Sequence, residues 1–298
     1  MAENSKIEWT DHTFNPWWGC TKVSPGCDNC YAAAFDKRVG GDHWGPGKDR
    51  RYFEQKHWNE PLRWNIKAGR LGRRERVFCA SMADVFDNEA IPTMRNRLWE
   101  LIKATGNLDW ILVTKRIGNA ADMLPPEWMR DGLPSNIWLL ITVVNQTEAD
   151  RDIPKLLKIP AKVRGLSCEP LLGPINFRWT PYAHQASGET YNEYLNRCGS
   201  VNEYEALRKI SWVIVGGESG HHARPMHPDW ARQARDQCAD AGVPFFFKQW
   251  GEWAPFYYRE DGDPLKTQTL DDGQVVHRIG KAPAGRYLDG ALYDGMPA

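Results

Sequence analysis

The sequence predicts an α/β fold, in which six or seven β/α units form a partial barrel. Short apolar segments rich in β-branched and aromatic residues alternate with segments whose apolar residues recur at helical spacing. Strands that alternate with helices form parallel sheets with right-handed crossovers. The expected strands also end, one after another, in polar or glycine residues. In a β/α barrel such strand ends meet at the face that carries the active site.

Seven strands are expected, in chain order at residues 13–18, 77–81, 110–114, 137–142, 163–167, 212–216 and 244–248. Near-continuous apolar strands are typical of a sheet that helices cover on its faces. Helical spacing is clearest at 94–102 and 230–238. The alternative is an open doubly wound sheet, with its ligand at a switch point of the strand order.

Two segments depart from this repeat. Residues 178–208 form a polar, aromatic insertion between the fifth and sixth strands, longer than an ordinary crossover. The tail from residue 253 contains turn pairs such as Asp272-Gly273, which are typical of hairpins. The expected domains are therefore a barrel at 1–252 that includes the insertion, and a hairpin-rich C-terminal extension at 253–298 packed on it.

Three cysteines, Cys20, Cys27 and Cys30, stand within eleven residues after the first expected strand. Three thiolates on one loop can hold three irons of a [4Fe–4S] cluster and leave the fourth without a protein ligand. No fourth cysteine or histidine follows at short spacing, which argues against a closed zinc site. Pro25 and Gly26 permit a tight turn between the ligands. The alternative is a zinc knuckle with a distant ligand, or unrelated structural cysteines.

The cysteine pattern resembles that of the radical S-adenosylmethionine (SAM) superfamily, with the first gap lengthened from three residues to six. Members of that superfamily chelate SAM at the open iron, cleave it reductively and abstract a substrate hydrogen with the 5′-deoxyadenosyl radical. The resemblance implies a partial barrel whose first strand leads into the cysteine loop. It implies a [4Fe–4S] cluster and SAM as cofactors, and a reductase or flavodoxin-type electron donor.

A second resemblance covers most of the chain. Its short motifs, in order, are Trp9-Thr10-Asp11, Asn15-Pro16, Gly19-Cys20, Ser81-Met82-Ala83-Asp84, Thr114-Lys115-Arg116, Cys168-Glu169-Pro170, Gly216-Gly217-Glu218-Ser219 and Lys248-Gln249-Trp250-Gly251. They look like those of an uncharacterised family of bacteriophages and bacteria, often encoded beside a three-Cys-motif partner protein. The resemblance implies that such a protein is a partner of this chain.

The residues expected to bind SAM follow the second and third strands. In the superfamily the end of the second strand lies nearest the SAM amino group, and here it supplies Ser81 and Asp84 in place of Gly-Gly-Glu. Asp84 has an alternative role as a cap of the following turn. Lys115 or Arg116 is expected to hold the SAM carboxylate or a substrate phosphate.

Three further residues are candidates for SAM binding. Thr142 and Asn145 follow the fourth strand and are expected near the ribose. Tyr31 follows the third cysteine and is expected to contact the adenine or a cluster sulfide, with plain packing as the alternative.

Glu169, Glu218 and Lys248 are the candidate catalytic residues, because they follow the fifth, sixth and seventh strands. If the strand ends converge, these charges complement an amino-acid-like group, its ammonium against a glutamate and its carboxylate against the lysine. The alternative is an internal ion-pair network, since buried charges are usually paired.

The formal net charge is zero, so no global basic field attracts nucleic acid. From Lys37 to Arg76, however, twelve Lys or Arg stand against five Asp or Glu, with five aromatic residues between them. Cations for phosphates and aromatic faces for bases are typical of a nucleic-acid groove. A solvated, arginine-rich connection packed over one barrel end is the alternative.

Other features of the composition place the chain in a reducing cytoplasm. No run of eighteen apolar residues predicts a membrane span, and the N-terminus lacks the pattern of a secretory signal. Seven cysteines, an odd number unevenly spread, do not form a disulfide framework.

These expectations together describe a radical SAM enzyme. The substrate favoured by the resemblance is modified thymidine in phage DNA, on which an isomerase would rearrange a glycyl group in DNA hypermodification. The alternatives are radical SAM modification of RNA or of a protein partner, and a non-catalytic iron–sulfur or zinc module that binds nucleic acid.

Overall fold

The computed structural model describes residues 2–177, 204, 206–256 and 265–297. Most of the expected insertion at 178–208 lies outside these residues. The chain divides into two compact units, the first formed by residues 1–141 and 159–164 and the second by 142–158 and 165–298. The domain boundary expected at 252/253 stays a prediction.

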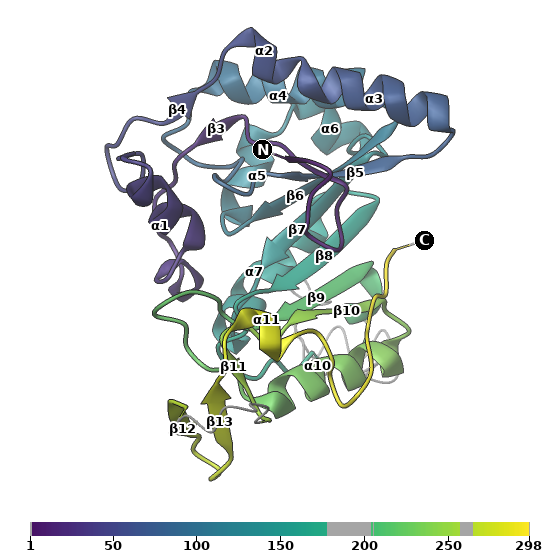
Figure 1. Ribbon diagram of the computed structural model, residues 1–298. Helices are drawn as coiled ribbons and strands as arrows, with labels where there is room; N and C mark the ends of the chain where they lie inside the picture. Colours follow the sequence, from purple (N-terminus) through teal and green to yellow (C-terminus); the bar gives the residue numbers. More distant parts are fainter. Residues whose placement is uncertain (1, 178–203, 205, 257–264, 298) are drawn as a thin grey trace. The chain divides into compact units, whose positions relative to one another are not determined.

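The first unit contains a sheet whose parallel strands lie in chain order (Figure 1). Its strands are β2 (His12–Thr13), β5 (Glu75–Cys79), β6 (Leu108–Thr114) and β7 (Ile137–Thr142), with β1 (Ala2–Glu3) antiparallel to β2. A separate ribbon pairs β3 (Trp17–Trp18) with β4 (Arg51–Tyr52) in antiparallel fashion.

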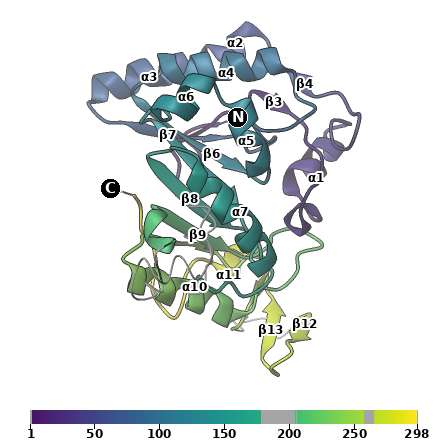
Figure 2. The same cartoon turned by 180° about the vertical axis from the view of Figure 1, so that it is seen from behind.

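Helices connect these strands. They are α1 (Tyr31–Arg38), α2 (Gln55–Trp58), α3 (Glu60–Leu71), α4 (Pro92–Ala104), α5 (Ala120–Met123) and α6 (Pro126–Asp131), with the 3-10 turns η1 (Pro25–Cys27) and η2 (Ile117–Asn119). The helices α3 and α4 lie side by side, and α3 packs on β5 and β6 (Figures 1 and 2). Trp64 of α3 and Trp99 of α4 are buried. The helical layer therefore covers the sheet, as apolar strands require.

The second unit has the same construction. Its strands β8 (Val163–Cys168), β9 (Trp212–Gly216) and β10 (Phe245–Gln249) are parallel and in chain order. The helix α10 (Pro228–Ala241) packs on β9 and β10, while α7 (Gln146–Lys158) precedes β8. The turn η3 (Leu207–Lys209) leads into β9.

The C-terminal extension forms the small sheet β11-β13-β12. Its strands are β11 (Trp253–Ala254), β12 (Thr267–Thr269) and β13 (Val275–Arg278), and the helix α11 (Lys281–Ala284) follows. The hairpin between β12 and β13 turns at the expected Asp272-Gly273 pair, where Gly273 has a φ of +88°.

Parallel strands in chain order with helical crossovers confirm the predicted fold class, an α/β partial barrel with a hairpin-rich C-terminal extension. One expected strand differs. The segment at 13–18 contributes only β2 to the sheet and then pairs as β3 with β4. Pro16 lies between the two pairings and has no N–H to continue the first one.

Among the described residues, no helix is both long enough and apolar enough to cross a membrane.

Candidate functional site

The three cysteines lie in the first unit, on the loop that leaves β3 and enters α1. Gly19 begins this loop with a φ of +114°, a conformation that favours glycine. Its N–H donates to the Met82 carbonyl at 3.0 Å. A Cβ at this position would lie 2.4 Å from the His43 carbonyl oxygen. Gly19 therefore fixes the start of the loop against the segment that follows β5.

Cys27 and Cys30 are held by local turns. The Ser24 hydroxyl accepts a hydrogen bond from the Gly26 N–H at 3.1 Å and so caps η1. The Cys27 N–H donates to the Ser24 carbonyl at 2.8 Å, and the Cys30 N–H donates to the Cys27 carbonyl at 3.3 Å. Cys30 is also the N-terminal cap residue of α1.

The donor set of this loop fits an iron–sulfur cluster. Cys20, Cys27 and Cys30 are free thiols and partly exposed, whereas the other described cysteines are buried. Among the described residues, the one group that brings three ligand atoms within 4.8 Å of one another contains no cysteine. The three thiols therefore do not all lie within 4.8 Å of one another. A cluster takes one thiolate per iron, so three thiolates can hold three of its irons.

Burial raises the pKa of the Cys20 thiol to about 12, and the carboxylates of Asp84 and Asp87 add to the rise. The guanidinium of Arg116 has the opposite effect on this pKa. The free thiol is therefore protonated at neutral pH. An iron ion that binds Cys20 has to displace its proton.

A buried arginine holds the cysteine loop to the segment after β5. The side chain of Arg50 is fully buried, and its Nε donates to the Asp87 carboxylate at 2.7 Å. Its terminal nitrogens donate to the Thr21 hydroxyl and to the Glu89 carboxylate, both at 3.0 Å. They also donate to three carbonyls of the loop His43–Lys48. In the sequence Arg50 was one of twelve cations of a basic segment, and nothing in its spacing indicates this role.

Ser81 lies in the turn after β5 and is tied to two other elements. The Asn15 Nδ2 donates to the Ser81 hydroxyl at 3.0 Å, and the Asn15 Oδ1 accepts from the Met82 N–H at 2.7 Å. The Tyr31 hydroxyl donates to the Ser81 carbonyl at 2.7 Å, although 59% of the tyrosine is exposed. Two of the residues expected around SAM, Ser81 and Tyr31, are thus brought together beside the third cysteine.

Asp84 is buried, and both of its carboxylate oxygens are engaged. Oδ1 accepts from the Thr114 hydroxyl at 2.8 Å and from the Phe86 N–H at 3.0 Å. Oδ2 accepts from the Lys115 N–H at 2.9 Å. Asp84 therefore joins the ends of β5 and β6 and caps the turn that follows it. These are the contacts of the capping role that the sequence left open, and a contact with SAM remains a prediction.

Lys115 and Arg116 follow β6 directly, and Lys115 is half-buried. The Arg116 N–H donates to the Thr114 hydroxyl at 2.8 Å, which turns the chain at the strand end. Its Nη2 donates to the Thr21 carbonyl at 2.7 Å and lies 3.7 Å from the Asp87 carboxylate. Arg116 thus reaches the cysteine loop at the residue next to Cys20.

Thr142 is the last residue of β7, Asn145 lies three residues further on, and both belong to the second unit. Thr142 is buried. The Asn145 Oδ1 accepts from the Glu148 N–H at 3.0 Å, and the Glu148 carboxylate accepts from the Val144 N–H at 3.1 Å. These two hydrogen bonds cap the N-terminus of α7, where Asn145 takes the N-cap position at which asparagine is preferred. The proposed ribose contacts of Thr142 and Asn145 stay predictions.

The second unit brings together two of the three candidate catalytic residues. The Lys248 Nζ lies 3.0 Å and 3.3 Å from the two carboxylate oxygens of Glu169, and the side chains are 22% and 14% exposed. Gly216 leaves room for this pair, because a Cβ there would lie 2.6 Å from the Glu169 Oε1.

Glu218, the third of these residues, is held by Arg224. The Arg224 Nη2 donates to the Glu218 Oε1 at 2.7 Å, while its Nε and backbone N–H donate to Oε2 at 2.9 Å and 2.8 Å. Glu218 is buried, so this bidentate pair satisfies both oxygens. Sequence reasoning missed Arg224, because it lies in a polar loop where a solvated cation is just as common.

Gly217 and Gly251 let the ends of β9 and β10 pass with their backbones in contact. A Cβ on Gly217 would lie 1.8 Å from the Trp250 carbonyl oxygen, and one on Gly251 would lie 2.1 Å from the Glu218 carbonyl oxygen. Gly251 also has a φ of +86°. Glycine is therefore required at these two positions because the backbones approach each other so closely.

The basic segment Lys37–Arg76 divides into two halves. Six of its cations pair with carboxylates, namely Lys48, Arg50, Lys67, Arg73, Arg74 and Arg76. The other six are exposed and have no carboxylate partner in the described part of the chain: Lys37, Arg38, Arg51, Lys56, Arg63 and Arg70. Arg51 lies over the rings of Trp18 and Phe53, 4.9 Å and 5.4 Å from their centres.

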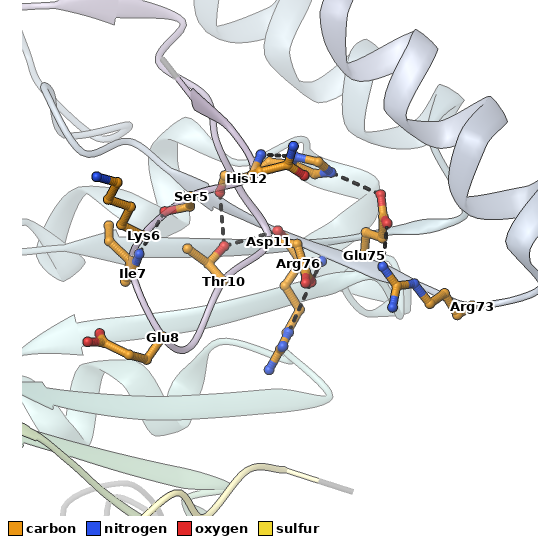
Figure 3. Close-up of a pocket in the computed structure, with 11 residues that line it drawn as sticks. Ser5, Lys6, Ile7, Glu8, Thr10, Asp11, His12, Arg73, Glu75 and Arg76 are labelled. Carbon is orange, nitrogen blue, oxygen red and sulfur yellow. Dashed lines mark hydrogen bonds and ion pairs between the residues drawn. The ribbon is translucent and has the colours of Figure 1, made fainter.

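A cavity of about 350 Å³ lies in the first unit at the amino ends of β2 and β5 (Figure 3). Its charged lining is largely paired: the Arg76 Nε lies 3.3 Å from the Asp11 carboxylate, and His12 and Arg73 lie 2.9 Å and 3.0 Å from Glu75. Burial alone would raise the pKa of Glu75, but the hydrogen bonds from His12 and Arg73 lower it below its ordinary value. This cavity is at the opposite end of β5 from the cysteine loop, and no candidate residue lines it.

Three solved structures to which the chain is similar are all of spore photoproduct lyase. They are a mutant with bound AdoMet and dinucleoside spore photoproduct (12% identity, TM-score 0.43), a complex with dinucleoside spore photoproduct (12%, 0.39) and another mutant (11%, 0.44). Each comparison covers 93% of this chain and 71% of the other. At these values the similarity assigns no function to this chain. No curated protein matches it.

The family DUF5131, described as "Protein of unknown function", matches residues 4–297. The match includes the cysteine loop, the strand ends of both units and the C-terminal extension. Because it extends over nearly the whole chain, the protein belongs to the DUF5131 family.

Proposed function

We propose that this protein is a radical SAM enzyme. The observation that carries the proposal is the cysteine loop, where three partly exposed thiols follow the first strand of a partial barrel. Around them Gly19 and Arg50 fix the loop against the end of β5 through backbone and buried ionic contacts. A loop held this firmly presents its thiols in one arrangement, as a cluster with a substrate-binding iron requires.

Cys20, Cys27 and Cys30 would hold a [4Fe–4S] cluster, which supplies the low-potential electron for reductive cleavage of SAM. The residues proposed to bind SAM are Ser81, Asp84, Lys115, Thr142, Asn145 and Tyr31. Of these, Tyr31 and Ser81 already lie together beside the third cysteine, and Asp84 shapes the strand ends around them. We also propose a reducing cytoplasm as its location and a reductase or flavodoxin-type protein as the electron donor.

The test is the cleavage of SAM by anaerobically reconstituted protein. After reduction with dithionite, we expect 5′-deoxyadenosine and methionine in equal amounts, measured by liquid chromatography and mass spectrometry. The Cys27→Ala variant is the matched control and should form neither. A protein that binds four irons yet forms no 5′-deoxyadenosine would instead be a non-catalytic iron–sulfur module.

For the substrate we propose modified thymidine in DNA, on which the enzyme acts as an isomerase of an attached glycyl group. The six cations that lack a carboxylate partner among the described residues, and the aromatic rings beneath Arg51, support binding of a nucleic-acid strand. The Glu169–Lys248 pair supports recognition of a zwitterionic group. The side chains of the pair are partly exposed, so a substrate can reach their charges.

The Glu169→Gln variant tests this substrate. It should lose turnover of a DNA oligonucleotide that carries glycyl-modified thymidine, while it retains the cluster and the slow cleavage of SAM without substrate. Glu252→Gln, in the same unit, is the matched control and should turn over normally. Equal turnover by Glu169→Gln would refute the role of the pair. Turnover of RNA or of a three-Cys-motif protein, with none of DNA, would identify the alternative substrate.

A further inference from the structure

Two arginines reach the same residue of the cysteine loop, Thr21, which directly follows Cys20. Arg50 donates to the Thr21 hydroxyl at 3.0 Å, and Arg116 donates to the Thr21 carbonyl at 2.7 Å. Both also lie against Asp87, at 2.7 Å and 3.7 Å. The two guanidinium groups therefore belong to one buried network behind the first cysteine.

They differ in how their donors are used. Every nitrogen of the Arg50 guanidinium donates to an acceptor of the protein. The Arg116 side chain is only 9% exposed, yet its Nε is buried and has no hydrogen-bond partner among the described residues. A buried donor without an acceptor is rare in folded proteins, because it loses its hydrogen bonds to water without replacement. The position of Arg116 therefore points to an acceptor supplied by a bound group.

The first cysteine lies beside this guanidinium. The Cys20 thiol and the Arg116 Nη2 both donate to the Thr21 carbonyl, at 3.5 Å and 2.7 Å. A neutral thiol is a poor acceptor, whereas a thiolate bound to iron and the sulfides beside it carry negative charge. The orphaned donor and the fixed positive charge thus match the sulfur side of a cluster held at Cys20.

We propose that Arg116 donates a hydrogen bond to the sulfurs of the cluster at Cys20 and thereby raises its reduction potential. This inference rests on the proposed function, because it requires the cluster. Reduction by a low-potential one-electron donor adds one negative charge to the cluster. A buried cation and an N–H donor stabilise that added charge, so the reduced form gains more than the oxidised form. Arg116 is a positioning residue in this scheme and takes no part in hydrogen transfer.

The experiment is a redox titration of the reconstituted cluster, followed by electron paramagnetic resonance, with iron content measured first. Arg116→Gln should bind iron as the unaltered protein does but require a more negative potential for reduction. Arg116→Lys keeps the positive charge but lacks the planar guanidinium group. Its reduction potential should lie between those of the unaltered protein and Arg116→Gln. Arg130→Gln, which removes an exposed arginine of α6, should leave the potential unchanged.

Each other outcome overturns the inference in a distinct way. A full cluster with an unchanged potential in Arg116→Gln would show that the guanidinium does not act on the sulfurs. Loss of SAM binding with an unchanged potential, measured by anaerobic calorimetry, would make Arg116 a SAM ligand. Folded Arg116→Gln and Arg116→Lys that both fail to bind iron would make it only a loop support. If the unaltered protein binds no iron, the proposed function fails as well.

Discussion

The strand ends of the two units carry similar charged residues and use them in different ways. In the first unit, Arg50, Asp87 and Asp84 are buried, and each is engaged with backbone or side chains that shape the cysteine loop. In the second unit, the Glu169–Lys248 pair is partly exposed and joins the end of β8 to β10. The comparison teaches that the first unit uses its charges as scaffold for three thiols. The second unit keeps a charge pair that is partly exposed.

The largest expected effect concerns the three thiols of the cysteine loop in the first unit. Cys27→Ala should lose nearly all iron after anaerobic reconstitution, because two local thiolates cannot hold the cluster in place of three. Iron and sulfide are measured by colorimetric assay, and absorbance near 400 nm reports the cluster. Cys238→Ala is the matched control, since this buried cysteine lies on α10 in the second unit. Full iron in Cys27→Ala would remove the loop from the metal site.

The next effect tests whether Arg50 is the centre of the scaffold. Arg50→Met removes the closest cation from the buried Asp87 carboxylate, which costs about 3–5 kcal/mol of unfolding free energy. Urea unfolding followed by circular dichroism measures this loss. Arg73→Met removes an arginine that is 65% exposed in a pair with Glu75, and it should cost about 0–1 kcal/mol. Similar losses in both variants would contradict the distinction between buried scaffold and surface pairs.

A smaller effect tests the exposed half of the basic segment. The double variant Arg38→Glu, Arg51→Glu should bind duplex DNA more weakly. The slope of log binding constant against log salt concentration should become shallower by about 0.9 for each phosphate that the protein no longer neutralises. Fluorescence anisotropy at several salt concentrations measures this slope. The charge-matched control is Arg130→Glu, Lys281→Glu, with both residues exposed and outside the segment. Equal slopes in the two double variants would mean that the basic segment packs over the fold and does not bind DNA.

The smallest effect lies at the opposite end of β5. The pKa of Glu75 is below its ordinary value because hydrogen bonds from His12 and Arg73 outweigh burial. A carboxyl with a lowered pKa stabilises the fold above its unfolded pKa and loses that contribution as the pH falls through its folded pKa. Glu75→Gln should therefore be less stable at pH 7, with a deficit that shrinks below about pH 4. Urea titrations from pH 7 to pH 3 measure it, and Glu100→Gln, on the exposed face of α4, should show no such trend.

The fold was largely readable from the sequence, because strand and helix periods are local properties of the chain. The expected strands at 137–142 and 212–216 coincide with β7 and β9. The cysteine loop was equally readable, since its turn residues and thiols lie within eleven positions. The first strand was not, because the pairing of β3 with β4 joins residues more than thirty positions apart.

The partners of the charged residues were decided only by the tertiary structure. The sequence put Glu169, Glu218 and Lys248 on successive strand ends, and the structure paired two of them while Arg224 took the third. Arg50 and Arg116 likewise meet Asp87 across 37 and 29 positions of the chain. Charge acts through space and is indifferent to sequence separation, so residue type alone does not say which carboxylate a cation will meet. The sequence therefore determined the fold class and the three thiols, and packing decided which charges hold the site and which remain exposed.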